Sequence, residues 1–292
     1  MIELLTHIRL FFLKLIQSIE TIIKILFLSR FKTEIKNIHP SKKEIVVLAN
    51  GPSIKELKFT DTFKDKYDFL SVNFSTSSTF FEQIKPQYHI INAPELWKEN
   101  VSEYYKEIRL ELFNQLKEKV TWPLILFIPF QSKKRKFWQE IIIKNSNIKI
   151  VFYNPTPVEG LSFINHFLYK INLGMPRPHN IVIPSLIILT NIGYKNIYLL
   201  GVDHSWLNEI FVDEKNETFV CQKHFYDYDK AKHEPMTKDG TGAKKLHEVL
   251  YKFYNTFKGY FEIDLYAKRR KTFIYNSTKR SYIDAFDREN IL

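Results

Sequence analysis

The chain has 292 residues, of which 45% are hydrophobic, 15% aromatic and 26% charged, which excludes disordered, collagen-like and low-complexity proteins. Lys and Arg number 43 against 32 Asp and Glu, and the formal net charge of +11 favours a polyanionic partner: nucleic acid, an anionic membrane surface or a phosphorylated small molecule. The single cysteine, Cys221, excludes an intramolecular disulfide and favours a reducing compartment, with the cytoplasm as the default.

Residues 1–36 are expected to form an amphipathic, membrane-associating helix. At about 100° per residue, the Leu, Ile and Phe side chains fall on one broad face. Five charged residues interrupt these apolar side chains: Glu3, Arg9, Lys14, Glu20 and Lys24. They leave no apolar run near the roughly 20 residues that are needed to cross a bilayer. We therefore expect a peripheral helix on the anionic inner face of the cell membrane. The alternative is a helix packed on its own domain or on a second copy in a homo-oligomer.

From residue 44 onward, short apolar runs alternate with polar, helix-like stretches. The predicted strands are 45–49, 69–73, 88–92, 123–128, 148–153 and 197–203, and the predicted helices between them are 99–120 and 184–192. This alternation is typical of an α/β fold with a doubly wound, mostly parallel, Rossmann-like sheet. Such sheets bind ligands outside the carboxyl ends of their strands.

The rest of the chain is expected to complete one domain over 44–292. Residues 205–245 have few apolar runs and many polar and aromatic side chains, so we expect a lid there. A helix over 243–258 and strands over 261–266 and 272–276 are expected to close the domain.

Asparagines stand at three successive strand ends: Asn50, Asn73 and Asn92. An amide supplies a donor and an acceptor, as recognition of a ribose or a base requires, although a single asparagine also terminates a strand well. Gly51 permits a close backbone approach after the first strand, and Ser53 is expected to cap a helix that begins at Ile54. Amides at such a helix start attract phosphate. The phosphate-binding patterns GxxxxGK[ST] and GxGxxG are both absent.

These motifs resemble the bacterial sialyltransferases of glycosyltransferase family 42. The resemblance is carried by 48–56 (LANGPSIKE), by Asn73 and Asn92, and above all by 191–203 (NIGYKNIYLLGVD). It implies a GT-A-like domain that uses a CMP-activated nonulosonic acid as donor and a cell-surface glycan or glycolipid as acceptor. It also implies metal-independent inverting transfer without a cofactor, and peripheral membrane association.

The resemblance also implies roles for individual residues. Asn50, Gly51 and Ser53 would contact the donor's phosphate and sugar, and Asn73 and Asn92 would contact its nucleotide and leaving-group side. The remaining residues implied to bind substrate are Arg177, Asp203 and His204.

The Asn-Gly-Pro-Ser and Gly-x-Asp elements also resemble the MptE-like family, named for a 6-hydroxymethylpterin diphosphokinase. That resemblance implies a pyrophosphokinase that uses ATP and magnesium. A third alternative is a noncatalytic nucleotide-binding partner in polysaccharide assembly. An amphipathic membrane helix favours the glycosyltransferase, because a soluble pterin pathway has no use for one.

Glycosyl transfer to a hydroxyl requires a base that titrates near neutrality, and histidine is the side chain whose ordinary pKa is nearest that range. The resemblance places the catalytic histidine in the lid, which favours His224, our first choice, or His233 over His204. Tyr226 and Tyr228 follow closely, and phenols can donate to a departing phosphate.

Two further patterns in the sequence bear on metal ions and nucleic acid as ligands. The nearest acidic neighbour of Asp203 is Glu209, so no DxD pair forms and no metal is expected. The basic runs 133–136 and 268–271 lack regular aromatic interleaving, so no nucleic acid is expected as a partner. These runs are either solvated loops or contacts to lipid phosphate.

Overall fold

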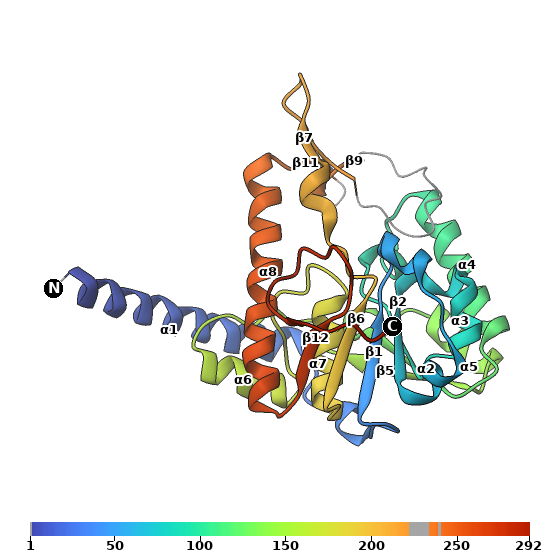
Figure 1. Cartoon of the computed structure of the whole chain (residues 1–292). Coiled ribbons are helices and arrows are strands. Elements are labelled where there is room, and N and C mark those ends of the chain that lie inside the picture. The colour runs from blue at the N-terminus through green and yellow to red at the C-terminus, as the bar shows by residue number, and fades with distance from the viewer. Residues whose placement is uncertain (1, 222–233, 239–240) are drawn as a thin grey trace.

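A computed structural model of the chain describes residues 2–221, 234–238 and 241–292. Its centre is an eight-stranded parallel sheet flanked by helices, with the strand order β13-β12-β6-β1-β2-β3-β4-β5 (Figure 1). The predicted α/β, Rossmann-like fold class is confirmed. The strands of this sheet are β1 (Glu44–Leu48), β2 (Asp68–Val72), β3 (Tyr88–Ile90), β4 (Leu124–Pro129), β5 (Ile148–Tyr153), β6 (Asn196–Leu200), β12 (Phe273–Asn276) and β13 (Asp287–Arg288).

Helices cover both faces of the sheet. They are α1 (Ile2–Leu28), α2 (Asp61–Lys66), α3 (Thr79–Ile84), α4 (Glu103–Lys119), α5 (Phe137–Lys144), α6 (Ser162–Lys170), α7 (Val182–Ile192) and α8 (Leu246–Arg269). Of these, α7 is buried along almost its whole length, because it packs between the sheet and α8 in one hydrophobic cluster. A second cluster, formed with α4 and α5, covers the opposite face at the β4–β5 edge.

The predicted strand over 261–266 is wrong, because α8 continues without a break to Arg269. Apolar and polar residues alternate within 260–267 (YFEIDLYA), and this pattern is typical of a strand with one buried and one exposed face. The buried side chains of α8 instead recur every three or four residues, at Phe253, Thr256, Tyr260 and Ile263. That spacing is the stripe of a helix, and Phe261 remains 47% exposed.

The described residues of 205–245, which are 205–221, 234–238 and 241–245, form small antiparallel elements above the carboxyl ends of the main strands (Figure 1). A 3-10 helix, η6 (Ser205–Glu209), leads into a sheet of three short strands. The short strands of this region are β7 (Ile210–Val212), β8 (Thr218–Val220), β9 (Glu234–Pro235), β10 (Thr237–Lys238) and β11 (Thr241–Ala243).

The helix α1 projects from the body and is held only through its C-terminal half (Figure 1). Ser18 Oγ accepts the Leu161 N–H at 2.9 Å. Thr21 Oγ1 donates to Glu159 O at 2.8 Å and accepts the Glu159 N–H at 3.0 Å. The helix therefore docks through hydrogen bonds on a narrow face.

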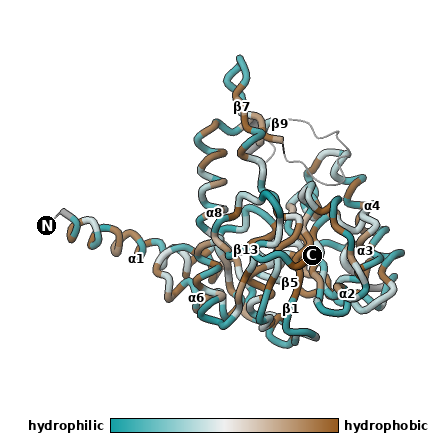
Figure 2. Tube along the Cα trace, viewed as in Figure 1, coloured by the Kyte–Doolittle hydropathy of each residue, from teal (hydrophilic) through white to brown (hydrophobic). Residues whose placement is uncertain are grey.

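That docked face differs from the predicted apolar face, which stays uncovered by the body. At about 100° per residue, Ser18 and Thr21 point well away from the stripe that contains Ile16, Ile19 and Ile23. Those three isoleucines are 55%, 53% and 49% exposed, and Figure 2 shows hydrophobic residues along the projecting helix. Among the described helices, none combines the length and apolarity of a membrane span.

Candidate functional site

The candidate site lies where the loops after β6, β1, β2 and β3 meet. These four strands are neighbours and run parallel, so their carboxyl ends share one edge of the sheet (Figure 1). The predicted residues Asn50, Asn73, Asn92 and Asp203 all stand directly after these strands. The topology thus brings together side chains that are far apart in the sequence.

The loops after β1 and β6 interlock at two glycines. The Gly51 N–H donates to Gly201 O at 2.8 Å, and Gly201 adopts a φ of +70°, which favours glycine. A Cβ on Gly51 would lie 1.9 Å from Asp203 Oδ2. Ser53 Oγ donates to that same carboxylate at 2.9 Å, across 150 residues of sequence. The Asn-Gly-Pro-Ser and Gly-x-Asp motifs are therefore two halves of one packed unit.

Two predictions for this loop are wrong. The helix expected from Ile54 is a short 3-10 helix, η2 (Pro52–Glu56), and Ser53 does not cap it. Ser53 instead lies inside η2, where its N–H and hydroxyl both bond to the Asp203 carboxylate. Burial raises the pKa of Asp203 above its ordinary value, and the hydrogen bonds from Ser53 oppose that change.

Asn50 presents an unsatisfied buried acceptor at the centre of the site. Its side chain is 8% exposed, and its Nδ2 approaches Val72 O at 3.4 Å. Its Oδ1 has no hydrogen-bond partner in the described part of the chain. A buried acceptor left unpaired costs about 1–3 kcal/mol. A donor from outside the described residues is therefore expected at this atom.

Asn73 supplies the complementary group from the next strand. Its backbone adopts a φ of 41°, and its Oδ1 accepts the Asn92 N–H at 3.1 Å. Among the described residues, no hydrogen bond engages its Nδ2, and the side chain is partly exposed. Asn50 and Asn73 thus offer an acceptor and a donor at adjacent strand ends.

The Asn92 amide is engaged by the protein itself. Its Nδ2 donates to Pro178 O at 3.2 Å, and its Oδ1 lies 2.9 Å from the buried Tyr153 hydroxyl. Burial raises the pKa of Tyr153 well above its ordinary value, so this hydroxyl keeps its proton and remains a donor. In this structure Asn92 ties the loop before α7 to the end of β3.

That loop holds the predicted Arg177 and a histidine that the sequence analysis missed. Arg177 forms an ion pair with Glu159 at 3.1 Å, and both side chains are about two-fifths exposed. His179 follows, and burial, Lys252 and further nearby cations lower its pKa to about 4. It is therefore neutral at pH 7. Its position between Arg177 and a predicted helix is the only sequence signal for it.

His204 is buried and acts as a packing element in this structure. Its ring stacks on Trp206 with 4.1 Å between centroids, and burial lowers its pKa to about 3. Its Nε2 lies 2.5 Å from the Tyr260 hydroxyl, which accepts from Asn180 Nδ2 at 2.8 Å. Asn180, Tyr260 and His204 are therefore linked by two hydrogen bonds in series.

The predicted catalytic residues His224, Tyr226, Tyr228 and His233 lie outside the described residues. Among residues 2–221, 234–238 and 241–292, no three His, Cys, Asp or Glu side chains converge as a metal site requires.

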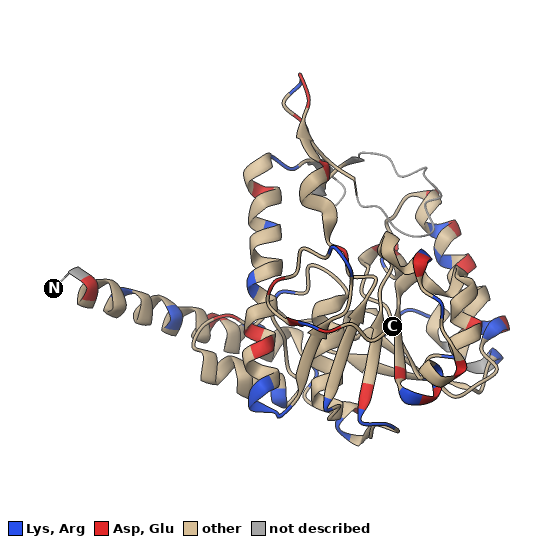
Figure 3. Ribbon diagram, viewed as in Figure 1, with Lys and Arg blue, Asp and Glu red and all other residues tan. Residues whose placement is uncertain are grey.

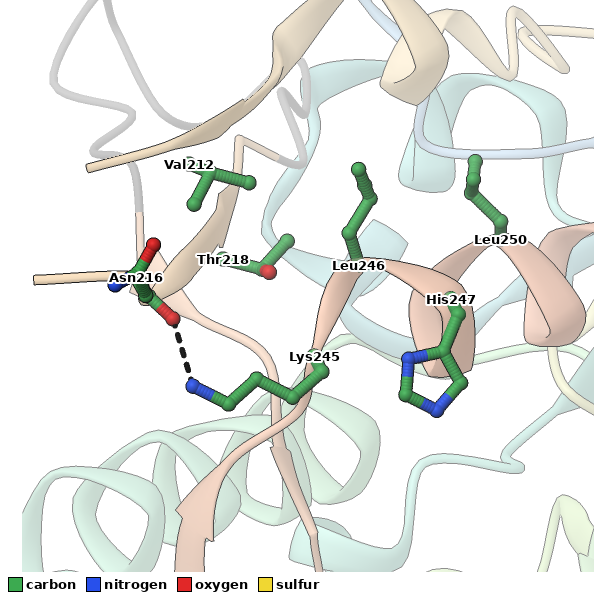
Figure 4. A pocket seen from close by; sticks show the side chains of 7 residues that line it. All are labelled: Val212, Asn216, Thr218, Lys245, Leu246, His247 and Leu250. Atoms are coloured by element: carbon green, nitrogen blue, oxygen red, sulfur yellow. Dashed lines mark hydrogen bonds between the residues drawn. The ribbon is translucent and has the colours of Figure 1, made fainter. Parts of the chain in front are cut away.

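A separate, shallow pocket of about 540 Å³ lies between the β7–β8 hairpin and the start of α8 (Figure 4). Lys245 Nζ donates there to Asn216 O at 2.8 Å. None of its lining residues belongs to the ends of the central strands, so it is not part of the candidate site. They are Val212, Asn216, Thr218, Lys245, Leu246, His247 and Leu250.

The chain matches no model of a known protein family, and no curated protein matches it either.

Gly51→Ala should destabilise the interlocked loops, because the new Cβ would overlap the Asp203 carboxylate. We expect a loss of about 1–3 kcal/mol of unfolding free energy, measured by urea denaturation. Gly259→Ala on α8 is the matched control, since its nearest neighbour would be an ordinary contact at 3.4 Å. The control should be neutral or gain up to about 1 kcal/mol. An unchanged stability of Gly51→Ala would contradict the packing described here.

Proposed function

We propose that this protein is a sialyltransferase-like glycosyltransferase. It transfers a sugar from a nucleotide-activated donor, a CMP-linked nonulosonic acid, to a cell-surface glycan or glycolipid. Two observations at neighbouring strand ends support this most. Among the described residues, the buried Asn50 Oδ1 has no hydrogen-bond partner and the Asn73 amide group donates no hydrogen bond. Both lie at the strand edge where doubly wound sheets bind nucleotides.

These two groups match a hydroxyl or a base edge of a nucleoside. A ribose hydroxyl donates to Asn50 Oδ1 and accepts from Asn73 Nδ2, and so satisfies both atoms at once. Pairing the buried oxygen removes a desolvation penalty, which makes the contact selective for a ligand with a donor at that point. Gly51 leaves room for the Asp203 carboxylate, which fixes the loop that carries Asn50.

The proposed chemistry is an inverting displacement without a metal. The acceptor hydroxyl oxygen attacks the anomeric carbon, and the bond from that carbon to the phosphate oxygen breaks. His224 takes the hydroxyl proton, CMP departs, and Tyr226 or Tyr228 donates to its phosphate. These assignments depend on the sequence motifs alone.

We further propose that α1 holds the enzyme on the inner face of the cell membrane. The uncovered stripe with Ile16, Ile19 and Ile23 supports this, because the body docks on a different face of the helix. Lys14 and Lys24 lie on the polar side of the helix, away from the stripe, and basic residues stand along the projecting helix (Figure 3). Both features suit an anionic bilayer surface.

Asn73→Asp should weaken CMP binding by about 10- to 100-fold, because it removes the free amide donor but keeps the oxygen that accepts from Asn92. Isothermal titration calorimetry in the presence of EDTA gives the affinity. Asn172→Asp is the matched control, since Asn172 also has a positive φ of 58° and an Oδ1 that accepts from Asn191. Equal affinities of the two variants for CMP would argue against the site.

His224→Gln should lower turnover by roughly 10²–10⁴-fold with little change in CMP affinity, because proton transfer matters in the transition state. Release of CMP from a CMP-activated nonulosonic acid in the presence of an acceptor glycan gives the rate. His247→Gln, in the pocket away from the strand ends, is the control. Full activity of the His224, His233 and His204 variants would rule out a histidine base.

Replacing Phe11, Phe12 and Ile16 by serine should abolish flotation with anionic liposomes, because it removes apolar contact area from the uncovered stripe. Turnover of a water-soluble acceptor should stay within about twofold. The control replaces Gln17, Glu20 and Lys24 by serine, on the charged face, and should still float. Flotation that survives the first set of changes would leave α1 without a membrane role.

A further inference from the structure

The loop before α7 joins the asparagine row to α8. On one side, Asn92 Nδ2 donates to Pro178 O. On the other, Asn180 Nδ2 donates to the Tyr260 hydroxyl on α8 at 2.8 Å. The loop and the helix are also neighbours at Gly259, where a Cβ would be in ordinary contact with Pro176 Cβ at 3.4 Å. Side chains on this face of α8 therefore stand next to the candidate nucleotide site.

Lys252 lies on this same face of α8, two turns before Gly259. Its side chain is only partly exposed, and its Nζ is 3.8 Å from Met236 Sδ. The backbone O of Met236 accepts the Lys244 N–H at 2.8 Å. Met236 thus contacts both the Lys252 side chain and the Lys244 backbone.

The charges in this region influence one another. Burial and the nearby Lys244 lower the pKa of Lys252, and Glu95 opposes this change. The same two lysines, together with Arg177, contribute to the lowered pKa of His179 in the loop. Around His179 and Lys252, the three cations Lys244, Lys252 and Arg177 therefore outnumber the carboxylates of Glu95 and Glu159 that oppose them.

Neither lysine has an acidic partner in the described part of the chain. The ion pairs found there do not include Lys244 or Lys252, whereas Arg177 pairs with Glu159. A partly buried ammonium without a counter-ion is costly to desolvate. An anionic ligand relieves this cost, and phosphate is an anion that lysine binds well as a point charge.

We propose that Lys244 and Lys252 form the phosphate-binding end of the nucleotide site. The ligand group is the phosphoryl group of the nucleotide whose nucleoside contacts Asn50 and Asn73. That assignment to a nucleotide rests on the proposed function, whereas the affinity of the two lysines for phosphate does not. These cations supply the positive charge that a divalent ion provides in other nucleotide sites.

The test compares CMP with cytidine by calorimetry in EDTA. Lys252→Gln should weaken CMP binding by about 10- to 100-fold and change cytidine binding by less than twofold. Lys258→Gln is the matched control on the same helix, at an exposed position, and should alter neither affinity. Lys244→Gln is the second variant, and thermal unfolding of each variant confirms that it is folded.

Inorganic pyrophosphate separates this inference from the proposed function. If neither CMP nor cytidine binds the wild-type protein, the nucleotide site is wrong. Pyrophosphate binding that falls at least tenfold in both lysine variants would then still support an anion site. An equal loss for CMP and cytidine would overturn the proposal, and so would pyrophosphate binding that both variants retain. CMP binding that survives while pyrophosphate binding is lost would also overturn it, because the anion would then belong to an acceptor.

Discussion

The close approach of two backbone loops at Gly51 and Gly201 is the constraint on which the candidate site depends. The Gly51 N–H bonds to Gly201 O, and the Asp203 carboxylate fills the space that a side chain at position 51 would need. Ser53 completes the contact through its hydroxyl. With the loop after β1 fixed in this way, the Asn50 amide reaches the end of β2, and its buried Oδ1 has no hydrogen-bond partner within the part of the chain that the structure describes.

A second set of hydrogen bonds fixes the loop before α7 against α8 and β3. Asn180 begins α7 by accepting the Val182 N–H, and its amide donates to Tyr260 on α8. The Tyr260 hydroxyl is in turn hydrogen-bonded to His204 Nε2, in the loop after β6. Asn92, after β3, is hydrogen-bonded to Pro178 O in the loop before α7. Side chains that are already fixed by such bonds lose little conformational entropy when they bind a ligand.

The sequence predicts the sheet well because strands buried on both faces are continuous apolar runs, as in β1 and β6. It also predicts the shared edge of Asn50 and Asn73, since parallel strands end together. It does not predict partners that only the closed fold brings together. Ser53 stands at a position typical of a helix cap, but its hydroxyl bonds to Asp203, 150 residues away. Likewise, the sequence does not distinguish Lys252 from the other lysines, because only the fold places α8 next to Pro176.

The central claim is that the edge formed by β6, β1, β2 and β3 binds a cytidine nucleotide without a divalent ion. Thermal unfolding of the full chain in EDTA, with CMP, CDP, UDP, GDP and ATP in turn, tests it most directly. A ligand at 100 times its dissociation constant adds about 2.7 kcal/mol, so CMP should raise the midpoint by several degrees and exceed the other nucleotides. Stabilisation by ATP alone, and only after magnesium is added, would contradict the claim and favour a pyrophosphokinase.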